Sequence, residues 1–219
     1  MPITPIHARP ETEGRATRKF LGSTIAAILT AYCLLSFPAG AQTPSDPEVT
    51  TALLIIDVQQ FYFPEGAVPL DNPRAASLNA KKLLAKWREA DRPVIHVGHN
   101  ARQGADFHPD VAPRDGERII MKDEVSAFNG TDLLDHLKLS GIEQLVICGM
   151  QTHMCVEAAV RAAHDLGFSC ILVHDACATR DLTFGDSTVS AAEVHLATLG
   201  TLNRVYAEVM DTETVLNTF

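Results

Sequence analysis

Short apolar segments of strand length alternate with segments of helical pattern along most of the chain. The strand-like segments cover six ranges: 52–56, 93–97, 118–121, 144–148, 170–174 and 204–209. The helical patterns cover four: 76–90, 131–140, 154–166 and 188–199. Nearly continuous apolar strands separated by helices are typical of a parallel sheet covered on both faces. We therefore predict an α/β fold, a three-layer sandwich in which a six-stranded, mainly parallel sheet is flanked by helices.

Turn and cap residues support these boundaries. Gly141 and Gly167 follow the second and third helical patterns and should end them, and Asp132 or Thr131 can cap the second. Asp186 or Ser187 should cap the last helix, which explains the sequence Gly-Asp-Ser at 185–187 better than a serine-esterase motif does. The stretch 99–117 has no helical pattern, and a loop of that length inside a compact domain is often functional.

The N-terminal segment has a different character. A basic stretch with Arg15, Arg18 and Lys19 leads into an apolar run over 20–37, which ends before Ala-Gly-Ala at 39–41. This pattern predicts a cleaved signal peptide over 1–41, a polar leader over 42–50 and one folded domain over 51–219. An uncleaved membrane anchor is the alternative, although the run barely reaches the roughly 18 residues that span a bilayer. We expect a periplasmic or secreted protein that has no membrane attachment after cleavage.

Charge and cysteine content narrow the function. The chain has 18 Lys and Arg against 27 Asp and Glu, a formal net charge of −9. Nucleic acids and anionic membrane surfaces both require a basic face, so neither is an expected partner. Of the five cysteines, one lies in the signal segment, and the apolar setting of Cys148 and Cys170 indicates buried free thiols rather than a disulfide framework.

Three reactive side chains follow strand-like segments. Asp57 comes directly after 52–56, Lys122 directly after 118–121, and Cys155 a short turn after 144–148. Each alone has a common structural explanation, as a turn, solvated or packed residue. Because the carboxyl ends of parallel strands meet at one edge of a sheet, where ligands bind in such folds, we expect all three to converge there.

The chemistry of this trio is that of acyl transfer. A thiol at a helix N-terminus faces unpaired backbone N–H groups, which should favour the Cys155 thiolate and could stabilise an oxyanion. The Lys122 ammonium should favour the thiolate further. Asp57 could accept the thiol proton and pass it to a leaving amine.

Three ordered motifs within 51–210 resemble the isochorismatase-like cysteine hydrolases, a superfamily with nicotinamidases, N-carbamoylsarcosine amidohydrolases, ureidoacrylate hydrolases and streptothricin hydrolase. They are Leu-Leu-Ile-Ile-Asp-Val-Gln at 53–59, Lys122 with Ser-Ala-Phe at 126–128, and Val-Ile-Cys-Gly-Met-Gln-Thr-His-Met-Cys-Val at 146–156. The resemblance implies a catalytic triad of Asp57, Lys122 and Cys155. It also implies a cis peptide between Met150 and Gln151, an oxyanion site made by the backbone N–H groups of Gln151 and Cys155, and a homo-oligomer.

The sequence departs from the nicotinamidases at their metal motif. Where they carry Asp-x-His, this chain has His-Val-Gly-His-Asn at 96–100. His96 and His99 could contact a metal at this spacing, but His96 lies in a strand pattern, where a core histidine is the better interpretation. We expect no metal and no cofactor, and nicotinamidase activity is disfavoured.

Side chains beside the triad in sequence are candidates for a substrate pocket, since small-molecule sites combine apolar walls with few polar groups. They are Tyr62 and Phe128, followed by Phe61, His99 and His153. The sequence thus predicts a hydrolase that cleaves an amide or carbamoyl C–N bond of a small molecule through an acyl-enzyme thioester. Isochorismatase-type hydrolysis of a vinyl ether and a non-catalytic binding protein of the same fold are the alternatives. The identity of the substrate cannot be read from the sequence.

Overall fold

The computed structural model describes residues 49–219, and the predicted signal peptide and most of the leader lie outside the described residues. Six strands form one sheet in the order β3-β2-β1-β4-β5-β8, and every neighbouring pair is parallel. The strands are β1 Thr51–Ile56, β2 Val94–His99, β3 Arg118–Lys122, β4 Gln144–Met150, β5 Ser169–Ala178 and β8 Glu208–Met210. The predicted six-stranded α/β sandwich is confirmed.

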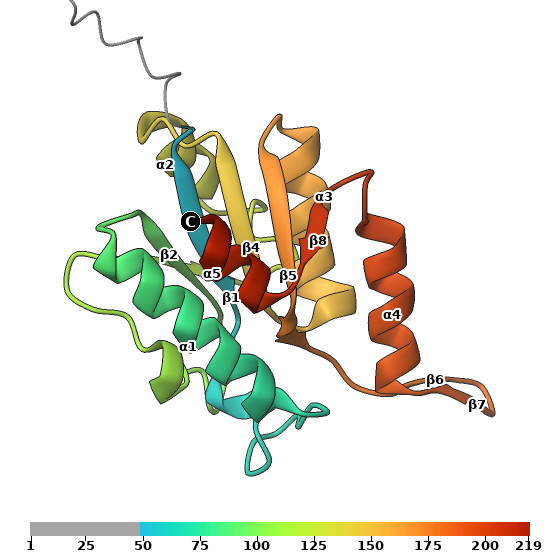
Figure 1. Ribbon diagram of the computed structural model, residues 1–219. Coiled ribbons are helices and arrows are strands. Elements are labelled where there is room, and N and C mark those ends of the chain that lie inside the picture. The colour runs from blue at the N-terminus through green and yellow to red at the C-terminus, as the bar shows by residue number, and fades with distance from the viewer. Residues whose placement is uncertain (1–48) are drawn as a thin grey trace, which may run out of the picture. The chain divides into compact units, whose positions relative to one another are not determined.

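Helices cover both faces of this sheet (Figure 1). The front face carries α1 (Pro73–Glu89) and α5 (Thr212–Thr218), which contact each other. Behind the sheet are α2 (Leu133–Leu139) and α3 (Glu157–Asp165), and α3 contacts α4 (Ala191–Leu202). Three short helical turns complete the list: η1 Gln60–Tyr62, η2 Pro109–Val111 and the π-helical η3 Thr152–Val156.

Burial follows from this layering. Every residue of β1 is buried, because the strand is central in the sheet and has helices over both faces. The edge strand β3 alternates, with Ile120 buried and Ile119 and Met121 about half exposed. Gly141 and Gly167 follow α2 and α3 with positive φ, as expected for residues that end helices.

The sequence-based boundaries are least accurate near the C-terminus. The last helix does not begin at 188, and neither Asp186 nor Ser187 caps it. Ser190 does, by accepting a hydrogen bond from the backbone N–H of Glu193. The residues before it form an antiparallel hairpin of β6 (Leu182–Phe184) and β7 (Ser187–Val189).

The predicted strand over 204–209 is also too long. The backbone N–H of Tyr206 donates to the carbonyl of Leu202, and Arg204 has φ of 67°, so the chain turns there before it becomes extended in β8. The helix α5 was not predicted at all. No helix among residues 49–219 combines the length and apolar character needed to cross a membrane.

Candidate active site

The parallel sheet brings three reactive side chains to one edge. Asp57 is the first residue after β1, and Lys122 is the last residue of β3. Cys155 lies in the π-helical turn that connects β4 to α3. All three stem from carboxyl ends of parallel strands, and β1 and β4 are direct neighbours, so the convergence expected from the sequence is what the fold produces.

The Lys122 ammonium lies between the other two groups. Its Nζ is 2.9 Å from Asp57 Oδ2 and 3.3 Å from Cys155 Sγ. The side chains of Asp57 and Lys122 are fully buried, and Cys155 is 5% exposed. An ion pair and a thiol thus share a site from which bulk water is excluded, where electrostatic interactions are stronger than in water.

The Asp57 carboxylate is held by few hydrogen bonds. Within the described residues it accepts none from a backbone amide, and the groups that act on its charge include the Lys122 ammonium, the Cys155 thiol and the His99 ring. Burial raises the pKa of Asp57, while Lys122 and Cys155 act in the opposite direction. A carboxylate with a raised pKa is a stronger base than a free aspartate, so Asp57 is suited to take a proton from the thiol beside it.

The thiol itself is not activated in the resting site. Burial, and then the negative charge of Asp57, raise the pKa of Cys155 to about 12, and the Lys122 ammonium only partly opposes them. Lys122 acts on the thiol in the expected direction, since its ammonium lowers the pKa of Cys155. Burial and the Asp57 charge outweigh it, so a standing thiolate is disfavoured and we expect the sulfur to lose its proton as it attacks.

The chain between β4 and Cys155 has unusual backbone geometry. The peptide between Met150 and Gln151 is cis, at the position that the resemblance implies. Gly149 just before it has φ of 133°, and a Cβ there would collide with the carbonyl oxygen of Ile56. Only glycine allows the end of β4 to come this close to the end of β1, next to Asp57.

The side chain of Gln151 connects two further residues to the site. Its Nε2 donates to Tyr62 Oη at 3.4 Å, and its Oε1 accepts from Arg180 Nε at 3.2 Å. Burial raises the pKa of Tyr62, and the nearby Asp57 carboxylate raises it further. Tyr62 therefore lies beside the reactive groups as expected, while Arg180 was missed by the sequence reasoning.

The remaining pocket candidates have different neighbours in the fold. His99 contacts the trio directly, with its Nδ1 3.2 Å from Lys122 Nζ. Phe61 is buried and packs on Tyr62, with ring centroids 4.1 Å apart. Phe128 is partly exposed, and its ring lies 6.5 Å from that of Phe168. His153 directs its Nδ1 to the hydroxyl of Thr179, at 2.6 Å.

The two histidines of the His-Val-Gly-His segment point to different partners. His96 is buried in β2, and its Nε2 lies 2.9 Å from Glu117 Oε2, so it has the structural role expected of a core histidine. His99 faces Lys122 instead. Among residues 49–219, no cluster of three or more His, Cys, Asp or Glu side chains is arranged to hold a metal ion. The four cysteines of this part of the chain are free thiols.

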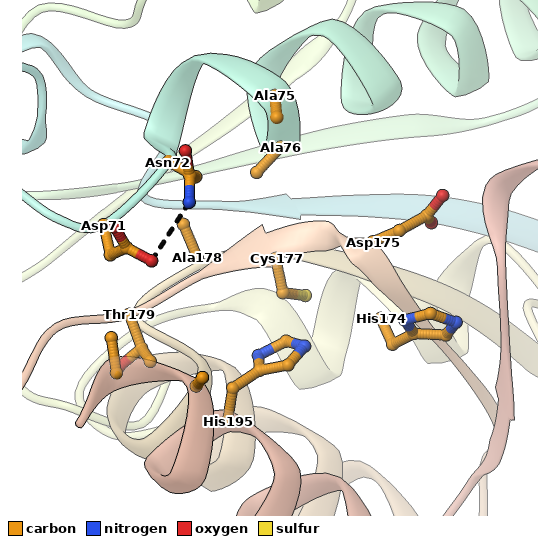
Figure 2. A pocket seen from close by; sticks show the side chains of 12 residues that line it. Asp71, Asn72, Ala75, Ala76, His174, Asp175, Cys177, Ala178, Thr179 and His195 are labelled. Atoms are coloured by element: carbon orange, nitrogen blue, oxygen red, sulfur yellow. Dashed lines mark hydrogen bonds between the residues drawn. The ribbon is translucent and has the colours of Figure 1, made fainter. Parts of the chain in front are cut away.

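A separate hollow of about 210 Å³ lies between α1, β5 and α4, and Asp57, Lys122 and Cys155 do not line it. Figure 2 shows His174, Cys177 and His195 grouped in it. Two of its lining residues contact the turn that carries Cys155, since His195 Nδ1 is 2.9 Å from the Thr152 hydroxyl and Thr179 contacts His153. Side chains that line the hollow thus help to hold the turn that carries Cys155.

A parallel α/β sandwich with a buried Asp-Lys-Cys group at its carboxyl edge has the composition of a cysteine hydrolase. Comparison with known proteins gives the family. The family model of the isochorismatase domain matches residues 51–214, so the chain belongs to the isochorismatase family. An uncharacterised member of that family from Bacillus subtilis, YddQ, is 42% identical over 77% of this chain and 99% of its own length. A crystal structure of a proposed isochorismatase hydrolase from Oleispira antarctica has a TM-score of 0.76 and 41% identity, and it covers 79% of this chain and 99% of that one.

Several relatives carry names that state an activity. Streptothricin hydrolase of Streptomyces noursei is 34% identical over 60% of this chain and 50% of its own length. Ureidoacrylate amidohydrolase RutB of Acinetobacter baylyi is 26% identical over 78% of this chain and 68% of its own length. The crystal structure of a cysteine hydrolase from Pseudomonas syringae has a TM-score of 0.74 and 26% identity, covering 80% of this chain and 94% of that one. The chain is a hydrolase of the isochorismatase family.

Proposed function

We propose that this hydrolase cleaves a C–N bond, in an amide or carbamoyl group of a small molecule, with Cys155 as nucleophile. The observation that carries the proposal is the position of the Lys122 ammonium, 2.9 Å from Asp57 Oδ2 and 3.3 Å from Cys155 Sγ in a buried site. The relatives named as amidohydrolase and cysteine hydrolase support the same chemistry. A vinyl ether has no acyl group that could be transferred to a thiol, so its hydrolysis would give the Cys155 nucleophile no role.

The first half of the reaction forms a thioester. Asp57 takes the thiol proton while Cys155 Sγ bonds to the substrate carbonyl carbon, because the resting thiol is neutral. The carbonyl oxygen becomes an oxyanion, which the backbone N–H groups of Gln151 and Cys155 stabilise. The C–N bond then breaks, and the amine leaves with the proton held by Asp57.

The second half releases the acid. Asp57 removes a proton from a water molecule, whose oxygen attacks the thioester carbonyl. The C–S bond breaks, and the proton returns to the sulfur. Lys122 stays charged throughout and stabilises the negative charge as it moves between the carboxylate and the sulfur.

A panel of primary amides, carbamoyl compounds and vinyl ethers, assayed for ammonia and for acid products, tests this function. We expect ammonia from one or more amide or carbamoyl compounds, and loss of that activity in Cys155→Ala. The matched variants Cys148→Ala, Cys170→Ala and Cys177→Ala should keep the activity and change only stability. Turnover of vinyl ethers alone, or full activity of Cys155→Ala, would exclude the proposal.

We further propose that the protein is exported. The support is the basic stretch, apolar run and Ala-Gly-Ala sequence within the first 41 residues. The N-terminal mass of material recovered outside the cytoplasm should correspond to a start near Gln42. Recovery of exported protein that still begins at Met1 or Pro2 would favour an anchor instead.

The resemblance also leads us to propose a homo-oligomer, with a small-molecule amide as substrate and no cofactor. Light scattering on the purified protein should give a mass that is a multiple of the chain mass. A monomeric mass at micromolar concentration would contradict it.

A further inference from the structure

The Lys122 ammonium has more neighbours than it has protons. Besides Asp57 Oδ2 and Cys155 Sγ, its Nζ lies 3.1 Å from the carbonyl oxygen of Glu124 and 3.2 Å from His99 Nδ1. An ammonium has three N–H donors, so four possible acceptors compete for them. The sulfur is the most distant of the four and, as a neutral thiol, the weakest acceptor.

We propose that His99 is a positioning residue of the hydrolase, which accepts the third Lys122 proton through Nδ1 and so holds the ammonium between Asp57 and Cys155. Asp57, the Glu124 carbonyl and His99 then take the three N–H groups of the resting enzyme. The thiol keeps its own proton for transfer to Asp57. When the sulfur becomes negatively charged during the reaction, the Lys122 N–H that faces His99 can turn to it, because His99 Nδ1 is the more distant of the two neutral acceptors, at 3.2 Å against 3.1 Å for the Glu124 carbonyl. This role rests on the proposed function.

The fold places His99 for this role. His99 is the last residue of β2 and pairs in register with Lys122 on β3, so the two side chains leave the sheet on the same side. The buried Gln59 side chain fixes the His99 backbone from the other side. Its Oε1 accepts from the His99 N–H at 2.8 Å, and its Nε2 donates to the His99 carbonyl at 3.0 Å.

The assignment fixes the tautomer of His99. An ammonium only donates, so Nδ1 must be unprotonated to accept, and the ring proton must be on Nε2. At alkaline pH, where an ordinary histidine is neutral, this distinction is measurable without any substrate. A histidine that merely fills space beside Lys122 has no reason to keep one tautomer.

The tautomer is read from a long-range ¹H–¹⁵N spectrum of the full chain, labelled with ¹⁵N-histidine, at pH 8.5. The His99 signals are assigned by their loss in His99→Asn. We expect an unprotonated Nδ1 that accepts a hydrogen bond, with the proton on Nε2, and a mixture of tautomers in Lys122→Met. A proton on Nδ1 in the wild type would overturn the proposal even if the enzyme proves to be an amidase.

Two variants test the functional consequence on whichever amide or carbamoyl compound the panel identifies. His99→Leu removes the acceptor and should lower kcat about tenfold with little change in KM. His99→Asn carries an amide oxygen close to the position of Nδ1 and should restore kcat to within about threefold of wild type. Equal losses in the two variants at equal thermal stability, or an unchanged kcat in His99→Leu, would overturn the positioning role and leave the Cys155 chemistry intact.

Discussion

Two carboxylates in this molecule, Asp57 and Glu117, are both withdrawn from water and have opposite characters. Glu117 accepts hydrogen bonds from Arg88 Nε at 2.6 Å, from the backbone N–H of Arg114 at 2.8 Å and from His96 Nε2 at 2.9 Å. Burial opposes its ionisation, but these bonds prevail and lower the pKa of Glu117 to about 2. Asp57 accepts no hydrogen bond from a backbone amide in the described part of the chain, and burial raises its pKa.

The difference separates structural from reactive acids. Both oxygens of Glu117 accept hydrogen bonds, so its charge is stable, and the residue connects the loop before β3, the helix α1 and the strand β2. Within residues 49–219, Asp57 is held by side chains alone, chiefly the Lys122 ammonium and the Cys155 thiol, so its carboxylate can still accept a proton at modest cost. Burial alone therefore does not make an acid reactive, since what matters is how few hydrogen bonds oppose its protonation.

The largest effect that distinguishes the two acids should come from Asp57→Asn. Asparagine has nearly the same shape but cannot take the thiol proton, so kcat/KM should fall about 10³-fold. The measurement is a rate assay on a compound identified by the substrate panel, with thermal denaturation to establish folding. Glu117→Gln is the matched control and should remain within about twofold of wild type. A similar loss of activity in both variants would remove the distinction.

The free energy of unfolding should rank the two acids in the opposite order, with the larger effect at Glu117. Glu117→Gln leaves the Arg88 guanidinium and the Arg114 amide facing a neutral side chain, and we expect it to cost about 3 kcal/mol of unfolding free energy at neutral pH. Urea denaturation measures this directly. A change below about 0.5 kcal/mol would show that the cluster around Glu117 is not a structural one.

Acid sensitivity sharpens the same comparison. The pKa of Glu117 is about 2 in the folded chain against 4.5 ordinarily, so its contribution is fully present above pH 4.5 and is lost as pH falls toward 2. Burial lowers the pKa of His96 in the folded chain. Below about pH 6.5 the unfolded chain therefore binds a proton at this residue more readily than the folded chain does, and the folded state loses stability. The stability gap between wild type and Glu117→Gln, measured by denaturation from pH 6 to 2.5, should therefore narrow below pH 4.5. A gap that stays constant over this range would contradict the pKa of Glu117.

The smallest effect concerns the cation of the reactive site. Lys122→Met removes the charge that lowers the pKa of Cys155, which is already raised to about 12, so alkylation by iodoacetamide at pH 9 should slow about tenfold. Peptide mass spectrometry gives the rate for Cys155 specifically. Lys122→Arg keeps the charge and is the control. An unchanged rate in folded Lys122→Met would show that the lysine does not influence the thiol.

The edge of the sheet that carries Asp57, Lys122 and Cys155 was predictable because apolar strand patterns show where each strand ends. Arg180 escaped the same reasoning. Its strand was predicted to stop at His174, because Asp175 interrupts the apolar pattern, whereas β5 continues to Ala178. The Asp175 carboxylate accepts hydrogen bonds from Asn79 and Thr212, so tertiary contacts compensate for a polar residue that the pattern interprets as a strand end.

Protonation was harder to predict than position. Spacing placed Cys155 near a helix start and near Lys122, and both favour a thiolate. The burial of Cys155, which is 5% exposed, depends on how the turn 152–156 packs against β4 and α4, and no local pattern encodes it. Similarly, nothing in the sequence shows that Gln59 fixes the His99 backbone from 40 positions away.

The most direct test of the central claim is to trap the covalent intermediate. An amide or carbamoyl compound that releases ammonia is mixed with the enzyme, quenched in acid within milliseconds to seconds, and analysed by intact and peptide mass spectrometry. We predict a mass increase equal to the acyl group on the peptide that contains Cys155, and none in Asp57→Asn or Cys155→Ala. Steady turnover with full activity in Cys155→Ala and no adduct on the Cys155 peptide would contradict the account.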